Sequence, residues 1–174
     1  RYQRYVYEQL LEAGEEFGIR MFGLHALNSL RLEKGFGSWA REYRPIYDPF
    51  EANLGRFIQM DKDFIGRDAL AAKYADDGPG ASLALVTFTV ESDAGREGVD
   101  VIGDEPIWHD GEVVGWVTSG GYAHHSETSV AMGYVPAALA ESDGPWQIEI
   151  IGDMKTATRV DGCIWDADAE RMRA

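Results

Sequence analysis

Residues 104–136 of this 174-residue chain read DEPIWHDGEVVGWVTSGGYAHHSETSVAMGYVP. Within it, two short runs rich in β-branched and aromatic residues, 106–108 and 113–117, lie on either side of a turn sequence. The pair Asp110-Gly111 in that turn suits a type I′ conformation, because both central residues of such a turn need a positive φ. We therefore predict a β-hairpin, followed by a long loop and another strand.

The same alternation with a period of two residues recurs before and after the hairpin. The further strands that it predicts cover residues 83–90, 129–135, 146–151 and 155–160. Short strands with turn signals at roughly ten-residue spacing are typical of a small antiparallel barrel or jelly roll. We predict a C-terminal β-domain of this kind.

The N-terminal part favours helices, because its apolar residues recur with a helical period. The predicted helices cover residues 2–17, 24–31, 48–58 and 66–74. The third opens with a capping box, in which Asp48 is the N-cap and Glu51 reaches back to it. In the second, we expect Leu24, Leu27 and Leu30 to point inward.

A run of turn-forming residues, DDGPG at 76–80, separates the two kinds of periodicity. It predicts an α-rich domain over residues 1–78 and a β-barrel domain over residues 79–174. The aromatic and basic segment 37–47, GSWAREYRPIY, reads as an ordered loop. The fold class predicted is α+β.

The chain is acidic, with 30 Asp and Glu against 16 Lys and Arg and a formal net charge of −14. This charge argues against nucleic acid as a partner, because phosphates need a basic surface. Solubility through repulsion, a salt-adapted source and the steering of a cationic amine are the open explanations. No stretch approaches the ~20 apolar residues of a membrane helix. Cys163 is the single cysteine, which rules out an intrachain disulfide and favours a cytoplasmic compartment.

Motifs that carry chemistry are mostly absent. The run GFGSWA at 35–40 fits the letters G-x-G-x-x-A, but it does not follow a buried strand as a dinucleotide site requires. His124 and His125 lack a third ligand at the spacing of a metal site. No serine elbow is present, and no spacing marks an acid/base pair of carboxylates. The sequence therefore predicts no catalytic residue and no metal site in this chain.

Several segments resemble the glycine-cleavage T-protein family. In that family a VG-x-VTSG hairpin follows an Asp-Gly turn and precedes an A-x-GYVP strand, as at 110–120 and 131–136 here. RLEKG at 31–35, Trp39 and G-x-EPI at 103–107 are similar to the sarcosine and dimethylglycine dehydrogenase branch. Further pieces in the family's order are LLEAG, GIR, PFEA and FIGRDAL, at 10–14, 18–20, 49–52 and 64–70.

The resemblance implies a three-lobed folate-binding portion. This chain would supply the end of an α+β, ferredoxin-like lobe, the connecting helices and the C-terminal barrel. The cofactor implied is tetrahydrofolate, and the small-molecule partners are a folate and a methylated amine. FAD would bind only in a possible upstream domain. The opening residues begin inside an amphipathic pattern, which favours a fragment whose other partners are upstream domains of the same polypeptide.

The resemblance also implies where the chemistry lies. The family's catalytic aspartate and its pterin-binding glutamate would precede residue 1, so we expect these 174 residues alone to have little or no activity. The T-protein's ARD, just before LRLE, corresponds to Ala26-Leu27-Asn28 here, so the arginine of that motif has no counterpart.

Four matched residues are candidates for binding the cofactor. Arg31 and Glu33 are expected to orient each other or to reach a folate carboxylate, for which a guanidinium is a two-pronged donor. Trp39 offers a face for a flat pterin or aminobenzoyl ring. Glu105 offers a hydrogen-bond acceptor to the ligand or to loop backbone. For each, a purely structural role is the alternative: a salt bridge at a helix end, an interlobe tryptophan or a loop contact.

Three function hypotheses follow. The first is the folate side of a dehydrogenase that oxidises sarcosine or dimethylglycine. The second is a stand-alone aminomethyltransferase or folate-dependent demethylase. The third is a noncatalytic β-module that docks or regulates a partner.

Overall fold

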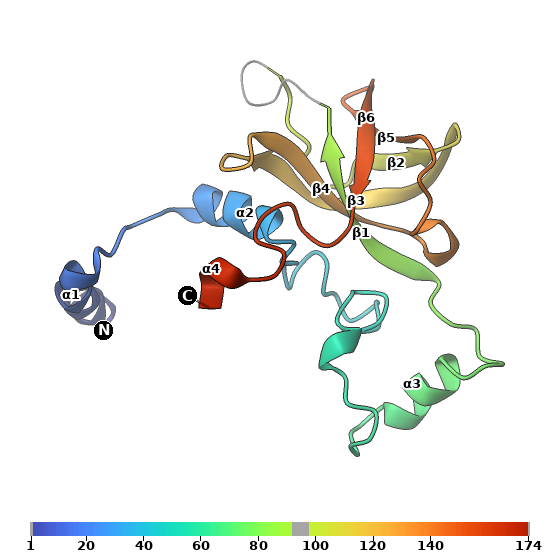
Figure 1. Ribbon diagram of the computed structural model, residues 1–174, viewed down its shortest axis with the longest axis horizontal. Coiled ribbons are helices and arrows are strands. Elements are labelled where there is room, and N and C mark those ends of the chain that lie inside the picture. Colours follow the sequence, from blue (N-terminus) through green and yellow to red (C-terminus); the bar gives the residue numbers. More distant parts are fainter. Residues whose placement is uncertain (1, 92–97, 174) are drawn as a thin grey trace.

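A closed antiparallel barrel forms the C-terminal half of the molecule (Figure 1). The computed structural model describes residues 2–91 and 98–173. The strands follow the order β1-β4-β3-β2-β5-β6, and β6 pairs back with β1. Their bounds are β1 Leu83–Val90, β2 Pro106–His109, β3 Glu112–Ala123, β4 Thr128–Pro136, β5 Trp146–Ile150 and β6 Asp153–Val160. The barrel predicted from the spacing of the strands is confirmed.

The hairpin that suggested this fold joins β2 to β3. Asp110 and Gly111 have φ values of 52° and 81°, as the type I′ turn requires. His109 pairs with Glu112 directly before and after the turn. The prediction from the Asp-Gly pair is therefore confirmed.

Gly115, the glycine of the VG-x-VTSG hairpin, lies on β3 close to the backbone of β4. A Cβ atom added there would collide with the carbonyl oxygen of Tyr134 on β4. On the same strand, the pairing shifts register between Val117 and Ser119. A β-bulge of this kind bends the strand, which helps the sheet to close.

The apolar core has two parts. The first fills the barrel and includes Phe88 and Trp146, whose rings lie 5.2 Å apart. The second lies outside the barrel wall, where Leu32, Met132 and Tyr134 pack together. This outer cluster fixes the end of the second helix against β3 and β4, so the barrel serves as the platform for the segments that precede it.

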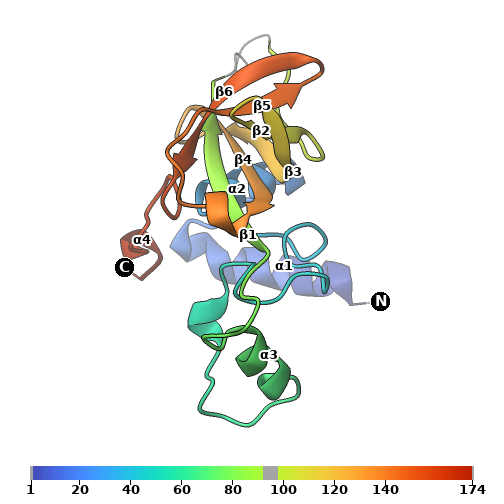
Figure 2. The ribbon, with the colours of Figure 1, turned by 90° about the vertical axis from the view of Figure 1, so that its right-hand side faces the viewer.

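The residues before β1 form helices and turns. The helices are α1 (Gln3–Gly14), continued by η1 (Glu15–Phe17), then α2 (Leu24–Glu33), η2 (Gly55–Phe57) and α3 (Arg67–Lys73). Figures 1 and 2 show α2 against the barrel, with α1 and α3 set apart from it. Residues 76–80 lie between α3 and β1, as expected, while the division into domains at 78/79 stays a prediction.

The orientation predicted for α2 was wrong. Leu24, Leu27 and Leu30 are exposed, by 82%, 47% and 51% of their surface, whereas Leu32 is fully buried against the barrel. The three leucines form an exposed apolar side of α2, and α1 also has exposed apolar residues and buries none. An apolar side with helical spacing therefore exists, but it faces away from the barrel.

The helix predicted over residues 48–58 was also wrong, although its capping box is present. Asp48 Oδ1 accepts hydrogen bonds from the amides of Phe50 and Glu51, and Glu51 Oε2 accepts one from the Asp48 amide. The turn stops at Asn53, whose φ of 57° is left-handed and whose side chain donates to the Leu85 carbonyl at 2.6 Å. Only the short η2 follows, because this contact with β1 redirects the chain.

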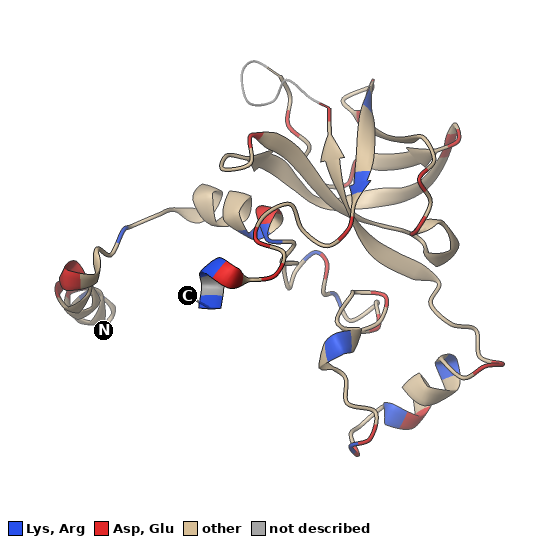
Figure 3. Cartoon of the chain, viewed as in Figure 1, with Lys and Arg blue, Asp and Glu red and all other residues tan. Residues whose placement is uncertain are grey.

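Charges are unevenly distributed over the molecule (Figure 3). Among the described residues of strands β1–β6, the Lys and Arg side chains are Lys155 and Arg159, both on β6. A locally basic segment, by contrast, contains Arg31, Lys34 and Arg41. In the part of the chain that is described, no helix has the length and apolar character needed to cross a membrane.

Candidate ligand-binding site

The end of α2 leads directly into a compact loop, residues 36–44, which we call the Trp39 loop. Gly35 has a φ of 66°, a left-handed conformation that glycine adopts without a steric penalty. The Gly35 amide donates to the Leu32 carbonyl and the Phe36 amide to the Arg31 carbonyl. These two bonds form a Schellman motif, which ends the helix and sets the direction of the loop. This left-handed position explains why the RLEKG segment has a glycine at residue 35.

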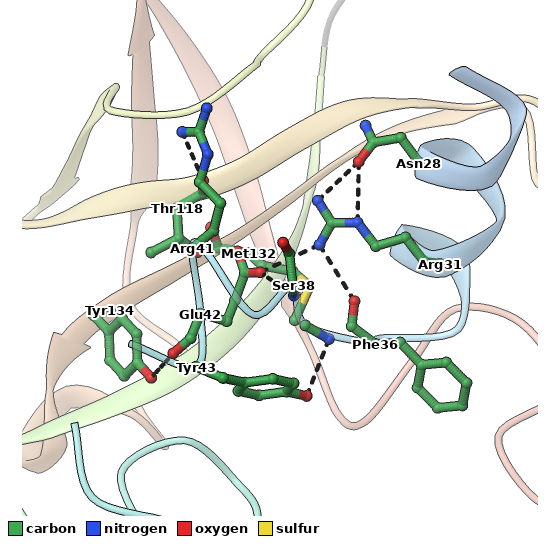
Figure 4. A network of polar contacts seen from close by, with 11 residues as sticks. Asn28, Arg31, Phe36, Ser38, Arg41, Glu42, Tyr43, Thr118, Met132 and Tyr134 are labelled. Atoms are coloured by element: carbon green, nitrogen blue, oxygen red, sulfur yellow. Dashed lines mark hydrogen bonds and ion pairs between the residues drawn. The ribbon is translucent and has the colours of Figure 1, made fainter. Parts of the chain in front are cut away.

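Arg31 lies under this loop and is held by contacts within the protein (Figure 4). Its Nε and Nη2 donate to Asn28 Oδ1 at 3.0 and 2.8 Å. Its Nη1 donates to the Phe36 carbonyl and to Glu42 Oε2, both at 3.3 Å. Burial lowers the pKa of the Arg31 guanidinium, and the Glu42 carboxylate opposes that shift. Most donors of Arg31 are therefore occupied.

Glu42 is the acid that pairs with Arg31, and its side chain is fully buried. The same Oε2 accepts the amide of Ser38 at 2.6 Å. The Glu42 carbonyl accepts the hydroxyl of Tyr134 on β4 at 2.7 Å, and burial raises the pKa of that tyrosine. Glu42 Oε1 has no hydrogen-bond partner among the described residues. This residue joins the helix, the loop and the barrel wall.

Trp39 projects from the loop, with 82% of its surface exposed. The loop beneath it is closed, because Ser38 O accepts the amides of Arg41, Glu42 and Tyr43. The Tyr43 hydroxyl also accepts the amide of Gly37 at 3.0 Å. A large flat ring thus stands in solvent on an ordered base, an arrangement that suits stacking with another flat ring.

A second contact ties the Trp39 loop to the barrel. Arg41 Nη1 donates to the Thr118 carbonyl at the bulge of β3 and lies 3.8 Å from Asp104 Oδ2. A Cβ atom on Gly103 would lie only 2.6 Å from that nitrogen. Glycine at this position therefore leaves the space that the guanidinium fills.

Glu33 faces a different neighbour from Arg31, and the two do not pair. Glu33 is nearly fully buried, at 2% exposure. Its Oε1 accepts the His125 amide at 3.1 Å and its Oε2 the Ser126 hydroxyl at 2.8 Å. Its carbonyl accepts the amide of Trp165 at 3.1 Å. Glu33 thus fastens α2 to the β3–β4 loop and to the C-terminal segment, which ends in α4 (Glu170–Arg173).

Glu105 lies on the barrel, just before β2. Its Oε1 accepts the amide of Ile102 at 2.8 Å, and its backbone carbonyl accepts the amide of Val117. Its Oε2 is buried without a hydrogen-bond partner among the described residues. Glu105 follows Asp104, the partner of Arg41, so the chain places it near the attachment of the Trp39 loop.

The structure therefore brings Arg31 and the Trp39 loop together and turns Glu33 to the other side of α2. Sequence analysis missed Asn28, Glu42 and Arg41. A signal was available for Asn28, because residues three apart on a helix are neighbours. The burial of Glu42 had no local signal, since Arg31 of α2 and Tyr134 of β4 form part of its environment. No group of His, Cys, Asp and Glu among the described residues is arranged to hold a metal ion.

Two family profiles match the chain. Residues 1–62 match the GCVT N-terminal domain, and residues 84–166 match the glycine cleavage T-protein C-terminal barrel domain. The chain belongs to the glycine-cleavage T-protein family. The resemblance noted in the hairpin and in RLEKG is thereby confirmed at the level of the family.

Relatives of this T-protein-family chain include two kinds of enzyme. Dimethylglycine dehydrogenase of Mus musculus, a mitochondrial protein by its name, is 41% identical over 155 residues, which are 88% of this chain and 17% of that protein. Aminomethyltransferase of Acidobacterium capsulatum is 37% identical over 146 residues, 83% of this chain and 37% of that protein. The chain thus spans well under half the length of either relative.

A solved structure has the same fold. The glycine cleavage system aminomethyltransferase T of Bartonella henselae superimposes with a TM-score of 0.76 at 26% sequence identity. The match covers 93% of this chain and 43% of that one. The predicted α+β class with a C-terminal barrel agrees with it.

Proposed function

We propose that this chain is the folate-side portion of a tetrahydrofolate-dependent one-carbon enzyme that acts with a dehydrogenase for N-methylated glycines. The observation that carries the proposal is the 41% identity to a dimethylglycine dehydrogenase, maintained over 88% of the chain. In this role, tetrahydrofolate would capture the one-carbon unit released from dimethylglycine or sarcosine. An FAD domain would belong to another part of the enzyme.

The Trp39 loop is our candidate for the contact with folate. Trp39 is exposed on an ordered base, so its ring is available to a pterin or aminobenzoyl ring. Arg41 and Arg44 are exposed on the same loop of an otherwise acidic chain, and cations there would favour the carboxylates of a folate tail. In our proposal Arg31 supports this site from below. Glu33, which lies on the other side of α2, and Glu105, whose unpartnered carboxylate oxygen is buried, have structural roles there.

Other parts of the parent protein would complete the site. The apolar side formed by Leu24, Leu27 and Leu30 is exposed, together with Tyr5 and Leu10 of α1. Exposed large apolar side chains that gather on one face mark interaction sites in soluble proteins. We propose that upstream domains cover it and that they supply the catalytic groups. The cytoplasmic compartment predicted from the single cysteine stays a prediction.

A stand-alone aminomethyltransferase or folate-dependent demethylase is the second candidate. It is favoured by the 37% identity to an aminomethyltransferase and by the TM-score of 0.76 with a solved one. The two candidates share the folate site and differ in whether an FAD-binding domain belongs to the same polypeptide.

A thermal-shift titration with 5-formyltetrahydrofolate tests the shared part of the proposal. At a folate concentration about tenfold above the dissociation constant, binding to the native state adds about 1.4 kcal/mol. For a chain of this size, that corresponds to a rise in Tm of roughly 3–5 °C. Trp39→Ala should abolish the rise.

The matched control is Phe57→Ala, which removes another exposed aromatic ring, at 64% exposure, far from the Trp39 loop in sequence. It should keep the full rise in Tm. An equal rise in wild type and Trp39→Ala, or none in wild type at any folate concentration, would contradict the proposed site.

A further inference from the structure

We propose that Glu42 is a positioning residue for Trp39. Its carboxylate holds the Trp39 loop in the shape that presents the indole ring, through the hydrogen bond to the Ser38 amide. Trp39 itself cannot fix its position, since 82% of its surface is exposed. The backbone on either side must do so, and Ser38 directly precedes the tryptophan.

The geometry points to one atom of Glu42. Oε2 accepts the Ser38 amide at 2.6 Å and also faces Arg31 Nη1 at 3.3 Å. The Ser38 amide, near the start of the loop, is therefore bonded to the carboxylate of Glu42, near the end of the loop. A bond to a charged acceptor is stronger than one between neutral groups.

The loop cannot adjust by moving Glu42, because the residue is anchored on the opposite side. The Glu42 carbonyl accepts the Tyr134 hydroxyl at 2.7 Å, and Tyr134 is fully buried on β4. Arg31 fixes the carboxylate from α2 and is itself oriented by Asn28. Glu42 thus fixes the backbone next to Trp39 relative to α2 and to the barrel.

Two variants separate the reach of the side chain from its charge. Glu42→Gln keeps the length and an acceptor oxygen for the Ser38 amide but loses the charge opposite Arg31. Glu42→Asp keeps the charge, but it is one methylene shorter, so its carboxylate falls short of the Ser38 amide. A role in stability alone predicts a lower Tm for both and no local difference between them.

The measurement is ¹⁹F NMR of the 174-residue chain labelled with 5-fluorotryptophan, combined with hydrogen exchange at the Ser38 amide. The Trp39 line is assigned by its loss in Trp39→Phe. We expect Glu42→Asp to shift or split the Trp39 line and to reduce protection of the Ser38 amide by roughly tenfold to a hundredfold. Glu42→Gln should keep both close to wild type, and the lines of Trp108 and Trp146 in the barrel should stay in place.

The matched control is Glu51→Gln, since Glu51 is also buried and also accepts backbone amides, those of Asp48 and Ser82. It should leave the Trp39 line unchanged. An unchanged Trp39 line in Glu42→Asp overturns the proposal, as does an equal movement of the barrel tryptophan lines. A fixed Trp39 matters for folate binding only if the proposed function is right. The NMR experiment contains no folate, so the positioning role of Glu42 and the proposed folate site can fail separately.

Discussion

Replacement of Arg31 by alanine should lower the free energy of unfolding by about 3–5 kcal/mol. The reason is the neighbour that it leaves behind. Glu42 is fully buried, and its carboxylate would lose the cation that compensates its charge. Asn28 Oδ1 and the Phe36 carbonyl would lose their donors as well.

Urea denaturation of the chain measures this change, with an unchanged m-value as the sign that only stability is affected. Arg4→Ala is the matched control, because Arg4 pairs with Glu8 on exposed α1 with 90% of its side chain accessible. We expect it to change stability by less than about 1 kcal/mol. A loss below 1 kcal/mol for Arg31→Ala would show that the buried pair contributes little.

The second large effect should come from Gly115→Ala. The added methyl group would collide with the carbonyl oxygen of Tyr134, a backbone atom of the paired strand β4 that no change of rotamer can move. Overpacking of this kind costs about 3 kcal/mol. Because Tyr134 also holds Glu42, the damage should spread from the barrel to the base of the Trp39 loop.

Gly23→Ala is the control for this substitution. Gly23 precedes α2 with a φ of −97°, and a Cβ atom there meets nothing within 4 Å. Its Tm should remain near that of wild type, whereas Gly115→Ala should melt several degrees earlier. Equal melting temperatures for Gly115→Ala and wild type would show that β3 and β4 can separate without cost.

The barrel could be predicted because its signals are local. The Asp110-Gly111 pair specifies its own turn through positive φ values, and alternation with a period of two reports which face of a strand is buried. The sequence signals of the helices predicted their extent less well. The capping box at Asp48 formed as expected, but its continuation depended on Asn53 meeting β1, a contact that no local pattern contains.

The apolar side of α2 shows a second limit. Helical spacing identified Leu24, Leu27 and Leu30 as one side, and it did so correctly. It could not tell whether that side meets the barrel or a partner, and Leu32 is the residue that packs on the barrel. Arg31 and Trp39 of the candidate site were predicted from the sequence. Glu42, which contacts Arg31 and the amide next to Trp39, was not, because the burial of a charged residue depends on segments distant in sequence.

The most direct test of a folate site at the Trp39 loop is a titration of 5-formyltetrahydrofolate against the 5-fluorotryptophan-labelled chain. Our proposal assigns the rest of the site to other parts of a longer protein, so for this chain alone we expect binding in about the millimolar range, which corresponds to roughly −4 kcal/mol. The ¹⁹F line of Trp39 should move and saturate, while those of Trp108 and Trp146 in the barrel stay unchanged. A Trp39 line that stays in place while folate binds elsewhere on the chain would contradict a folate site at the Trp39 loop. So would a Trp39 line that stays in place up to the highest folate concentration reached.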